Sequence, residues 1–224
     1  IKATKSAREL DRSLIVCMKD PKARITVSIT PVEIKAVLFD FDNTLEEWAE
    51  PQKYAENALA ESLKEFVPKD RFLEMFDEVR KANEYKTRDP NKYSRHFWLK
   101  SIFSYLDLGL DPEKYERIYW EAAMERIRPF PGVIDTLKRI RLKKGIVSDS
   151  EGSKAIKIAR IMKVGVYRLV DEIVTGDDLG LNKPNRKVFQ VIAKRLKVKP
   201  EECIMVGDHP EADLIDAKPL GITT

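Results

Sequence analysis

Two aspartates stand two residues apart at the end of an apolar run early in the chain. Residues 34–39 read IKAVLF, and Asp40 and Asp42 follow directly. A short run rich in Val, Leu and Phe fits a strand buried on both faces, as in a parallel sheet. Residues i and i+2 of a strand point to one side, so both carboxylates are expected to share a small volume where open parallel sheets bind ligands. Such close anions imply a bound cation or a shared proton, unless they form a solvated acidic turn.

The segment DFDNTL at 40–45 resembles the first signature of the haloacid dehalogenase (HAD) superfamily, most of whose members are Mg-dependent phosphatases. Three further signatures of that family follow in the expected order. Ser148 ends the run GIVS, Lys183 precedes a proline in LNKPN, and Asp208 and Asp213 lie in CIMVGDHPEAD. Each motif ends a predicted strand or opens a predicted helix, which makes the resemblance specific.

The resemblance implies a role for each acidic motif. Asp40 would be the nucleophile that forms an aspartyl-phosphate, and Asp42 would be the general acid and base. Mg²⁺ would be held by Asp40, Asp208 and the backbone carbonyl of Asp42, because carboxylate and carbonyl oxygens suit this hard cation. Asp213 would orient the motif lysine or a metal-bound water.

The remaining motif residues are expected to hold the phosphoryl group. Ser148, Lys183 and Thr44 would contact its oxygens, and the backbone N–H of Asp149 would add a donor where the strand opens into a helix. Ordinary structural explanations also exist. A serine at this place can be a helix N-cap, and a lysine before proline can lie in a solvated turn.

The hydrophobic pattern predicts an α/β fold, namely a doubly wound, Rossmann-like parallel sheet with an inserted α-helical bundle as cap. Core residues are predicted at 34–47 and 129–224, and the cap at 48–128. The first 33 residues, 1–33, form an N-terminal extension with a possible helix and hairpin, and their role is not readable. In this division, the expected nucleophile Asp40 comes before the helical bundle in the sequence.

The sequence also predicts where individual helices and strands lie, both in the bundle and in the core that follows it. The third cap helix is expected to start near Asn91 with Phe97 on its buried stripe, and the fourth to start after Asp111 as N-cap. Core helices are predicted at 132–141, 153–163, 185–196 and 211–217, and strands at 143–148, 171–175 and 203–207. Turn residues are lacking between Arg141 and Leu142, and a further strand would begin at Thr224. We therefore expect additional residues in the natural chain at both places.

Composition narrows the classes of partner. The chain has 224 residues, 43% of them hydrophobic, and its net charge of +4 comes from 41 basic and 37 acidic residues that are well mixed. This balance favours neither a nucleic-acid partner nor a membrane, and no apolar run is long enough to span a bilayer. Cys17 and Cys203 lie in apolar runs typical of buried thiols, and the predicted location is the cytoplasm. The oligomeric state stays open between monomer and homodimer.

Two segments are candidates for substrate selectivity. Trp48 follows the first motif closely, and the polar segment 87–96 contains Arg88, Arg95 and His96. These side chains could contact an anionic or hydroxylated leaving group if they cover the site. The same polarity also fits a solvated loop between two helices.

The resemblance implies a Mg-dependent phosphate monoester hydrolase acting on a small phosphorylated metabolite. Asp42 argues against a dehalogenase, because dehalogenases of the family generally lack an acid at that position. A phosphomutase or phosphotransferase stays open, since it differs mainly in what accepts the phosphoryl group. A receiver-like signalling domain or a non-catalytic binding protein is a further alternative, disfavoured by the order of the motifs and by the retention of all four.

Overall fold

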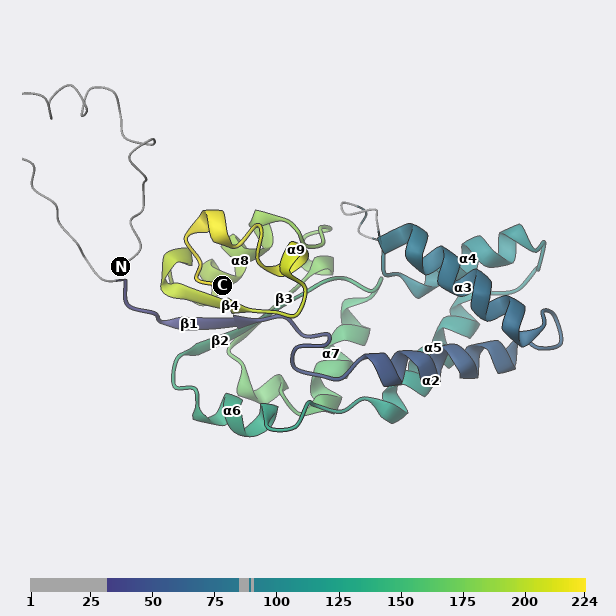
Figure 1. Ribbon diagram of the computed structural model, residues 1–224, viewed down its shortest axis with the longest axis horizontal. Helices are drawn as coiled ribbons and strands as arrows, with labels where there is room; N and C mark the ends of the chain where they lie inside the picture. Colours follow the sequence, from purple (N-terminus) through teal and green to yellow (C-terminus); the bar gives the residue numbers. More distant parts are fainter. Residues whose placement is uncertain (1–31, 85–88, 90) are drawn as a thin grey trace, which may run out of the picture. The chain divides into compact units, whose positions relative to one another are not determined.

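The computed structural model describes residues 32–84, 89 and 91–224 of the chain (Figure 1). The helix and hairpin predicted for the N-terminal extension, together with Cys17 and Arg88, lie outside the described residues. Within the described part, a parallel sheet is surrounded by helices, and four helices are inserted between its first strand and the rest of the core.

Four parallel strands form the sheet in the order β3-β2-β1-β4. Their bounds are Ala36–Phe39 for β1, Lys143–Ser148 for β2, Glu172–Thr175 for β3 and Cys203–Val206 for β4. Phe39 of β1 lies level with Ile146 of β2 and with Val206 of β4. All four residues of β1 are buried, as expected for a short apolar strand with a neighbour on each side. The end of β1 therefore lies between the ends of β2 and β4.

Helices cover both faces of this sheet (Figure 1). The core helices are α6 Val133–Arg139, α7 Lys154–Val164, α8 Arg186–Arg195 and α9 Pro210–Asp213. Leu38 packs in one apolar cluster with Phe189 of α8, whereas Phe39 packs in another with Ile161 of α7. Successive side chains of β1 thus face opposite layers. The predicted doubly wound α/β fold is confirmed.

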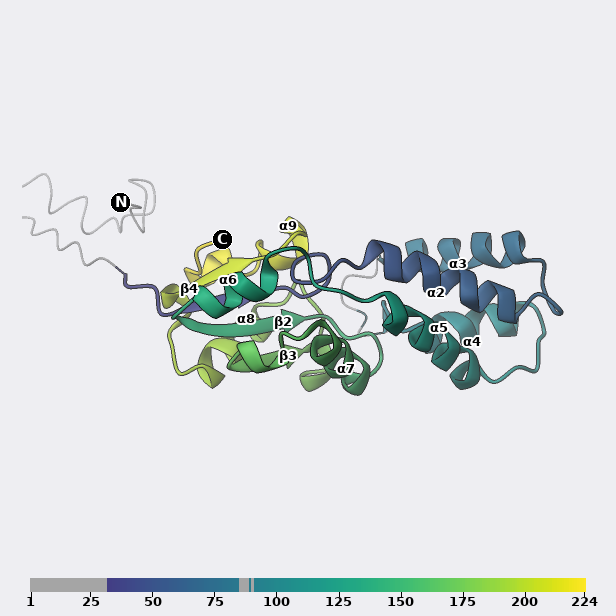
Figure 2. The same ribbon diagram turned by 90° about the horizontal axis from the view of Figure 1, so that it is seen from below.

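Four helices are inserted between β1 and α6. They are α2 Ala49–Ser62, α3 Lys69–Glu84, α4 Arg95–Tyr105 and α5 Pro112–Arg126. Figures 1 and 2 agree that α2 lies beside α5. The core of the inserted helices is aromatic. The ring centroid of Phe76 of α3 lies 5.5 Å from that of Trp98 of α4 and 6.1 Å from that of Tyr119 of α5. None of the described helices is long and apolar enough to cross a membrane.

The chain enters the inserted helices and leaves them through two neighbouring segments. Glu46 pairs with Pro129 in an antiparallel bridge. The backbone N–H of Glu47 donates to the carbonyl of Arg128 at 3.2 Å. The segments just before α2 and just after α5 are therefore joined to each other by backbone bonds. The predicted division into a core domain and a cap domain stays a prediction.

The third inserted helix begins later than predicted. The Ser94 hydroxyl accepts the N–H of Phe97 at 3.3 Å, so α4 starts at Arg95 and not near Asn91. This later start changes which side chains face the core. Trp98 is buried, while Phe97 is 37% exposed. The prediction that Phe97 lies on the buried stripe was wrong, because the N-cap at Ser94 sets the register of the helix.

The last core helix is shorter than the predicted 211–217. Regular helix ends at Asp213, and the N–H of Ile215 then bonds to the carbonyl of Pro210 at 3.2 Å, which is a wider turn than an α-helix makes. Short 3₁₀ helices complete the core: η2 Tyr167–Leu169, η3 Gly176–Asp178, η4 Pro200–Glu202 and η5 Lys218–Leu220. The prediction of one continuous helix over 211–217 was therefore wrong.

Additional residues were predicted at 141–142 and after Thr224, and the structure describes the residues beside both places. Residues 140–142 join α6 to β2. Thr223 pairs with Ile204 at the outer edge of β4 in a parallel bridge. Additional residues at 141–142 and after Thr224 stay a prediction.

Two phenylalanines of the inserted helices test how much the aromatic core contributes to stability. Phe76 is 1% exposed and Phe66 is 50% exposed. Phe76→Ala should lower the free energy of unfolding by about 3–5 kcal/mol, because it removes a buried ring and leaves a cavity. Phe66→Ala, as the matched control, should change it by less than about 1 kcal/mol. Urea unfolding followed by circular dichroism measures both, and equal losses would contradict the packing described.

Candidate active site

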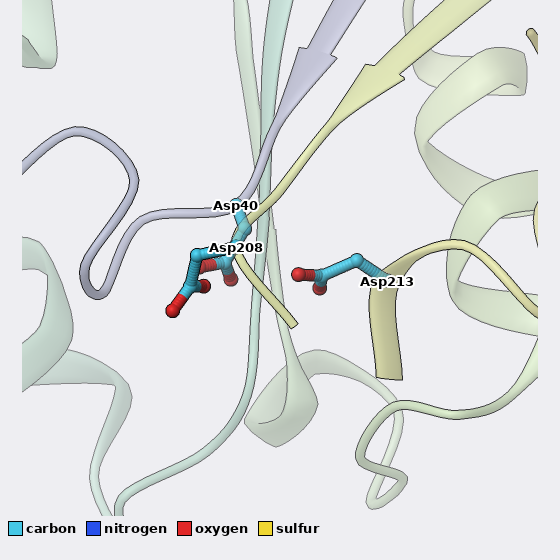
Figure 3. A group of neighbouring side chains, drawn as sticks. All are labelled: Asp40, Asp208 and Asp213. Atoms are coloured by element: carbon cyan, nitrogen blue, oxygen red, sulfur yellow. The ribbon is translucent and has the colours of Figure 1, made fainter. Parts of the chain in front are cut away.

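Three carboxylates meet beside the end of β1 (Figure 3). Asp40 directly follows β1, Asp208 lies two residues beyond β4, and Asp213 ends α9. Ligand oxygens of all three lie within 4.8 Å of one another. The strands β1 and β4 are neighbours in the sheet, and this pairing brings Asp40 and Asp208 together although they lie far apart in the sequence.

Lys183 lies between two of these carboxylates. Its ammonium donates to Oδ1 of Asp40 at 2.5 Å and to Oδ1 of Asp213 at 2.6 Å. A third bond, at 3.2 Å, goes to the backbone carbonyl of Val147. Lys183 is itself buried, so these bonds fix the ammonium beside Asp40.

A glycine makes room for Asp213. A Cβ atom on Gly207 would stand 2.2 Å from Oδ2 of Asp213, far inside any possible contact. The same Oδ2 accepts the backbone N–H of His209 at 3.1 Å. Asp213 therefore has one oxygen on Lys183 and the other on the backbone, an arrangement that suits a residue orienting the lysine.

Opposing effects act on Asp40 and Lys183. Burial raises the pKa of Asp40 to about 7, against the attraction of Lys183, and the charges of Asp213 and Asp42 add to the rise. Burial works to lower the pKa of Lys183, but the charges of Asp40, Asp149 and Asp213 outweigh it and raise that pKa well above its ordinary value. The lysine is therefore a permanent cation in a site with an excess of carboxylates.

The carboxylate group is chemically suited to a hard cation. Asp40 and Asp208 present oxygens without nitrogen or sulfur ligands, and Asp208 is exposed to solvent, where a hydrated ion can approach. Both oxygens of Asp213 already have partners, which favours a supporting role for this residue. The side chain of Asp42 does not belong to the group.

Three predicted phosphate-binding residues lie around the same carboxylates. The Thr44 hydroxyl accepts the N–H of Asp208 at 3.1 Å and lies 3.4 Å from Oδ2 of Asp40. Ser148 ends β2, and its hydroxyl donates to Oδ2 of Asp42 at 3.3 Å. The carboxylate of Asp149 accepts the backbone N–H of Lys183 at 2.7 Å. The structure thus brings Thr44 and Ser148 next to motif carboxylates and Asp149 next to Lys183.

Asp42 has a different set of partners from Asp40. Its Oδ1 accepts a bond from Arg160 and its Oδ2 one from Lys157, at 2.5 and 2.6 Å. Burial alone would raise the pKa of Asp42, but the charges of Arg160 and Lys157 outweigh it and hold this pKa below its usual range. Two carboxylates only two residues apart are therefore compensated by separate cations.

Sequence reasoning missed four charged residues around Asp42. They are all buried: Glu46, Glu151, Lys157 and Arg160. A helical signal could have found two of them. Lys157 and Arg160 share the spacing i, i+3, i+4, i+7 with Ile161 and Val164, which is the buried face of α7. Charged side chains are rarely fully buried without partners, so residue type alone does not predict the burial of either residue.

The selectivity candidates divide into two groups. Trp48 and Arg95 line the cavity that contains Asp40, whereas His96 lines a second cavity. Arg88 lies outside the described residues. Arg95 is buried and lies 4.8 Å from the ring of Trp98, so the alternative of a solvated side chain was wrong for Arg95, whereas His96 is exposed.

The cavity around Asp40 has a volume of about 300 Å³ and combines groups from the core and the inserted helices. This size is at the lower end for ligand pockets and suits a small molecule. Cationic, amide and aromatic side chains from the loop after β1 and from the inserted segment line the cavity together with the motif residues. Those from residues 43–126 are Asn43, Trp48, Gln52, Arg80, Tyr93, Arg95 and Trp98.

Comparison with known proteins gives a family and an enzyme class. The family model of haloacid dehalogenase-like hydrolases matches residues 34–221. A protein of Methanopyrus kandleri named glyceraldehyde 3-phosphate phosphatase is 30% identical, over 85% of this chain and 82% of its own length. A protein of Halopiger xanaduensis named ribulose-1,5-bisphosphate 5-phosphatase is 26% identical, over 84% of this chain and 82% of its own.

A similar solved structure is also that of a phosphatase. The crystal structure of a HAD phosphatase from Thermococcus onnurineus is 29% identical and superposes with a TM-score of 0.63, covering 84% of each chain. The predicted class of enzyme, a phosphatase, is thereby confirmed. The match of the family model over most of the chain confirms the family as well, and the protein belongs to the haloacid dehalogenase-like hydrolases.

Proposed function

We propose that this phosphatase hydrolyses small phosphate monoesters through an aspartyl-phosphate on Asp40. The observation that carries the proposal is the position of Asp40, which is buried at the end of the central strand with Lys183 at 2.5 Å and Asp208 beside it. A carboxylate there can attack phosphorus, while the lysine offsets the charge of the phosphoryl oxygens. Thr44, Ser148 and the backbone N–H of Asp149 would hold those oxygens.

The proposed reaction has two steps. First, Asp42 binds a proton from solvent. A carboxylate oxygen of Asp40 then bonds to phosphorus, the bond to the ester oxygen breaks, and Asp42 gives its proton to the leaving alkoxide. Second, water attacks the phosphorus of the aspartyl-phosphate while Asp42 takes a proton from it, which releases inorganic phosphate and restores both carboxyl groups. The sum of the steps is ester plus water to alcohol plus phosphate.

We further propose Mg²⁺ as the cofactor. Asp40, Asp208 and the backbone carbonyl of Asp42 would hold it, and Asp213 would orient Lys183 beside it. When bound, this ion reduces the repulsion between the Asp40 carboxylate and the substrate phosphate. The exposed position of Asp208 and the all-oxygen carboxylate group support the choice of a hard cation.

The inserted helices are proposed to act as a cap that selects the substrate. Trp48 and Arg95 line the cavity beside the motif residues, and the cavity is small. The relatives named glyceraldehyde 3-phosphate phosphatase make this triose phosphate the first substrate to test. Ribulose 1,5-bisphosphate, from the name of another relative, is the second.

Replacing the proposed nucleophile tests the central step. Asp40→Asn should lower turnover of glyceraldehyde 3-phosphate by at least about a thousandfold, because an amide cannot form the phosphoenzyme. Asp135→Asn, at an exposed position of α6, is the control and should keep full activity. Release of inorganic phosphate is the measurement. Retained turnover in Asp40→Asn with native circular dichroism would exclude Asp40 as the nucleophile.

Metal dependence can be read without turnover. Mg²⁺ should raise the melting temperature of the chelator-treated enzyme, because a ligand that binds only the folded state stabilises it. In Asp208→Asn this rise should disappear, whereas Asp135→Asn should retain it. Chelator should abolish phosphate release by the wild type and Mg²⁺ should restore it. Full activity in excess chelator after dialysis would contradict the assignment.

Two neighbouring residues test the proposed cap. Arg95 lines the catalytic cavity and His96 does not. Arg95→Lys should change the ranking of natural phosphate esters by about 1–3 kcal/mol in kcat/KM, since a planar guanidinium and an ammonium bind differently. His96→Ala should leave the ranking as in the wild type. An unchanged ranking in Arg95→Lys would place selectivity at other residues of the cavity.

A further inference from the structure

A group of buried charges surrounds Asp42 and has no part in the proposed reaction. Its members are Glu46, Glu151, Lys157 and Arg160. Lys157 is 1% exposed and Arg160 is 0% exposed. Burying ions is costly even when they are paired, and apolar residues of similar size often stabilise a fold as well or better. Such a group is therefore a candidate for function.

Both oxygens of Asp42 are held by this group. Arg160 donates through Nη2 to Oδ1 at 2.5 Å, and Lys157 donates through Nζ to Oδ2 at 2.6 Å. Because each oxygen has its own cation, the carboxylate cannot rotate about its last bond without breaking a charged hydrogen bond. The Asp42 side chain is 27% exposed and lines the catalytic cavity together with Lys157, so the two cations fix its position at the wall of this cavity.

The two cations are held in turn by a second carboxylate. Glu151 lies 3.1 Å from Lys157 and accepts a bond from Nη1 of Arg160 at 2.5 Å. Glu151 follows Ser148 and Asp149 in the loop after β2, where sequence reasoning placed phosphate-binding groups. One carboxylate thus orients both cations that hold Asp42.

Arg160 also reaches the segment that leads to the inserted helices. It pairs with Glu46, and its guanidinium lies 3.8 Å from the ring of Trp48. Glu46 in turn bridges to Pro129 of the returning segment. Arg160 is therefore anchored at three places, namely Glu151 in the loop after β2, Glu46 after the first motif, and Trp48 directly before α2.

We propose that Lys157 and Arg160 are positioning residues that hold the carboxylate of Asp42 at the catalytic cavity. The inference rests on the proposed function, because it assumes that Asp42 exchanges a proton with the leaving group and with water. Lys183 serves Asp40 through separate bonds, so the two aspartates of the first motif are positioned independently. Loss of Lys157 should then affect only the steps that need Asp42.

The test compares two kinds of ester in Lys157→Met. One is the alkyl phosphate that the wild type hydrolyses best, whose leaving group needs a proton, and the other is p-nitrophenyl phosphate, whose leaving group does not. We expect kcat/KM to fall roughly 10- to 100-fold for the alkyl ester, within the range that general acids contribute. For the activated ester it should fall by less than about threefold. Lys163→Met, at an exposed position of the same helix, should match the wild type.

A double-mutant cycle separates positioning from a structural role. In an Asp42→Asn background, Lys157→Met should cause no further loss, because the group that it positions is already inactive. Lys157→Arg, which keeps the charge, should recover part of the alkyl ester activity. An equal loss on both esters, an unchanged alkyl ester activity or a further loss in the Asp42→Asn background would each overturn the proposal.

Two further measurements keep the result interpretable. Removing Lys157 leaves Glu151 with one partner fewer, so Lys157→Met could fail to fold. Lys157→Met combined with Glu151→Gln balances the charge, and the same criteria then apply to that variant. Failure of the proposed function has its own signature, which is a wild type without phosphate release or an Asp42→Asn variant with full alkyl ester activity.

Discussion

The repulsion between Asp40 and Asp42 is the constraint on which the site depends. Two carboxylates two residues apart at the end of one buried strand destabilise each other unless each has its own compensation. The structure compensates them from opposite sides, with Lys183 at Asp40 and with Lys157 and Arg160 at Asp42. The pKa values of the two carboxyl groups differ as a result. Burial raises the pKa of Asp40 to about 7, whereas two cations hold the pKa of Asp42 below its usual range. A divalent cation at Asp40 would supply the charge that this side lacks.

The central place of β1 makes this compensation possible. With β2 on one side and β4 on the other, the end of β1 is surrounded by the ends of two more strands. Ser148 is the last residue of β2, and Asp208 lies two residues beyond the end of β4. The cations come from outside the sheet, because Lys157 and Arg160 lie on α7 and Lys183 precedes α8, and these helices cover opposite faces. A site at the edge of the sheet could not receive groups from both faces and from both neighbouring strands.

The sequence predicts the parts of this arrangement that depend on local pattern. Apolar runs that end in Asp40, Ser148 and Asp208 mark strand ends, and a parallel sheet brings strand ends together, so both the fold class and the meeting of the carboxylates could be expected. The start of α4 was missed because Ser94 competes with Asn91 as the first residue, and only the capping bond decides between them. Such competition between nearby polar residues is not readable from periodicity.

Buried charges are the other part that sequence could not supply. Lys157 lies on the apolar face of α7, but a long charged side chain there can also extend past the apolar surface into water. Only tertiary partners remove that choice, and those partners, Asp42 and Glu151, belong to other segments of the chain. The same holds for Arg95, which lies against the rings of Trp48 and Trp120 from other segments of the chain. Residue type alone therefore predicts that these charged side chains are exposed to solvent, although the fold buries them.

The contact between Arg160 and Trp48 would tie the proposed substrate selectivity to the proposed reaction. Trp48 lines the cavity, where it is proposed to contact the substrate, and its ring also lies 3.8 Å from the guanidinium that holds Asp42. A substitution of Trp48 that reshapes the cavity would also release one side of Arg160, so the orientation of Asp42 would change together with the fit of the substrate. Gln52 and Tyr93 line the same cavity, and the bonds described for Asp42 do not involve them. Under the proposed mechanism, substitutions at these two positions should therefore alter substrate selectivity with less effect on the proton transfers of Asp42 than substitutions of Trp48.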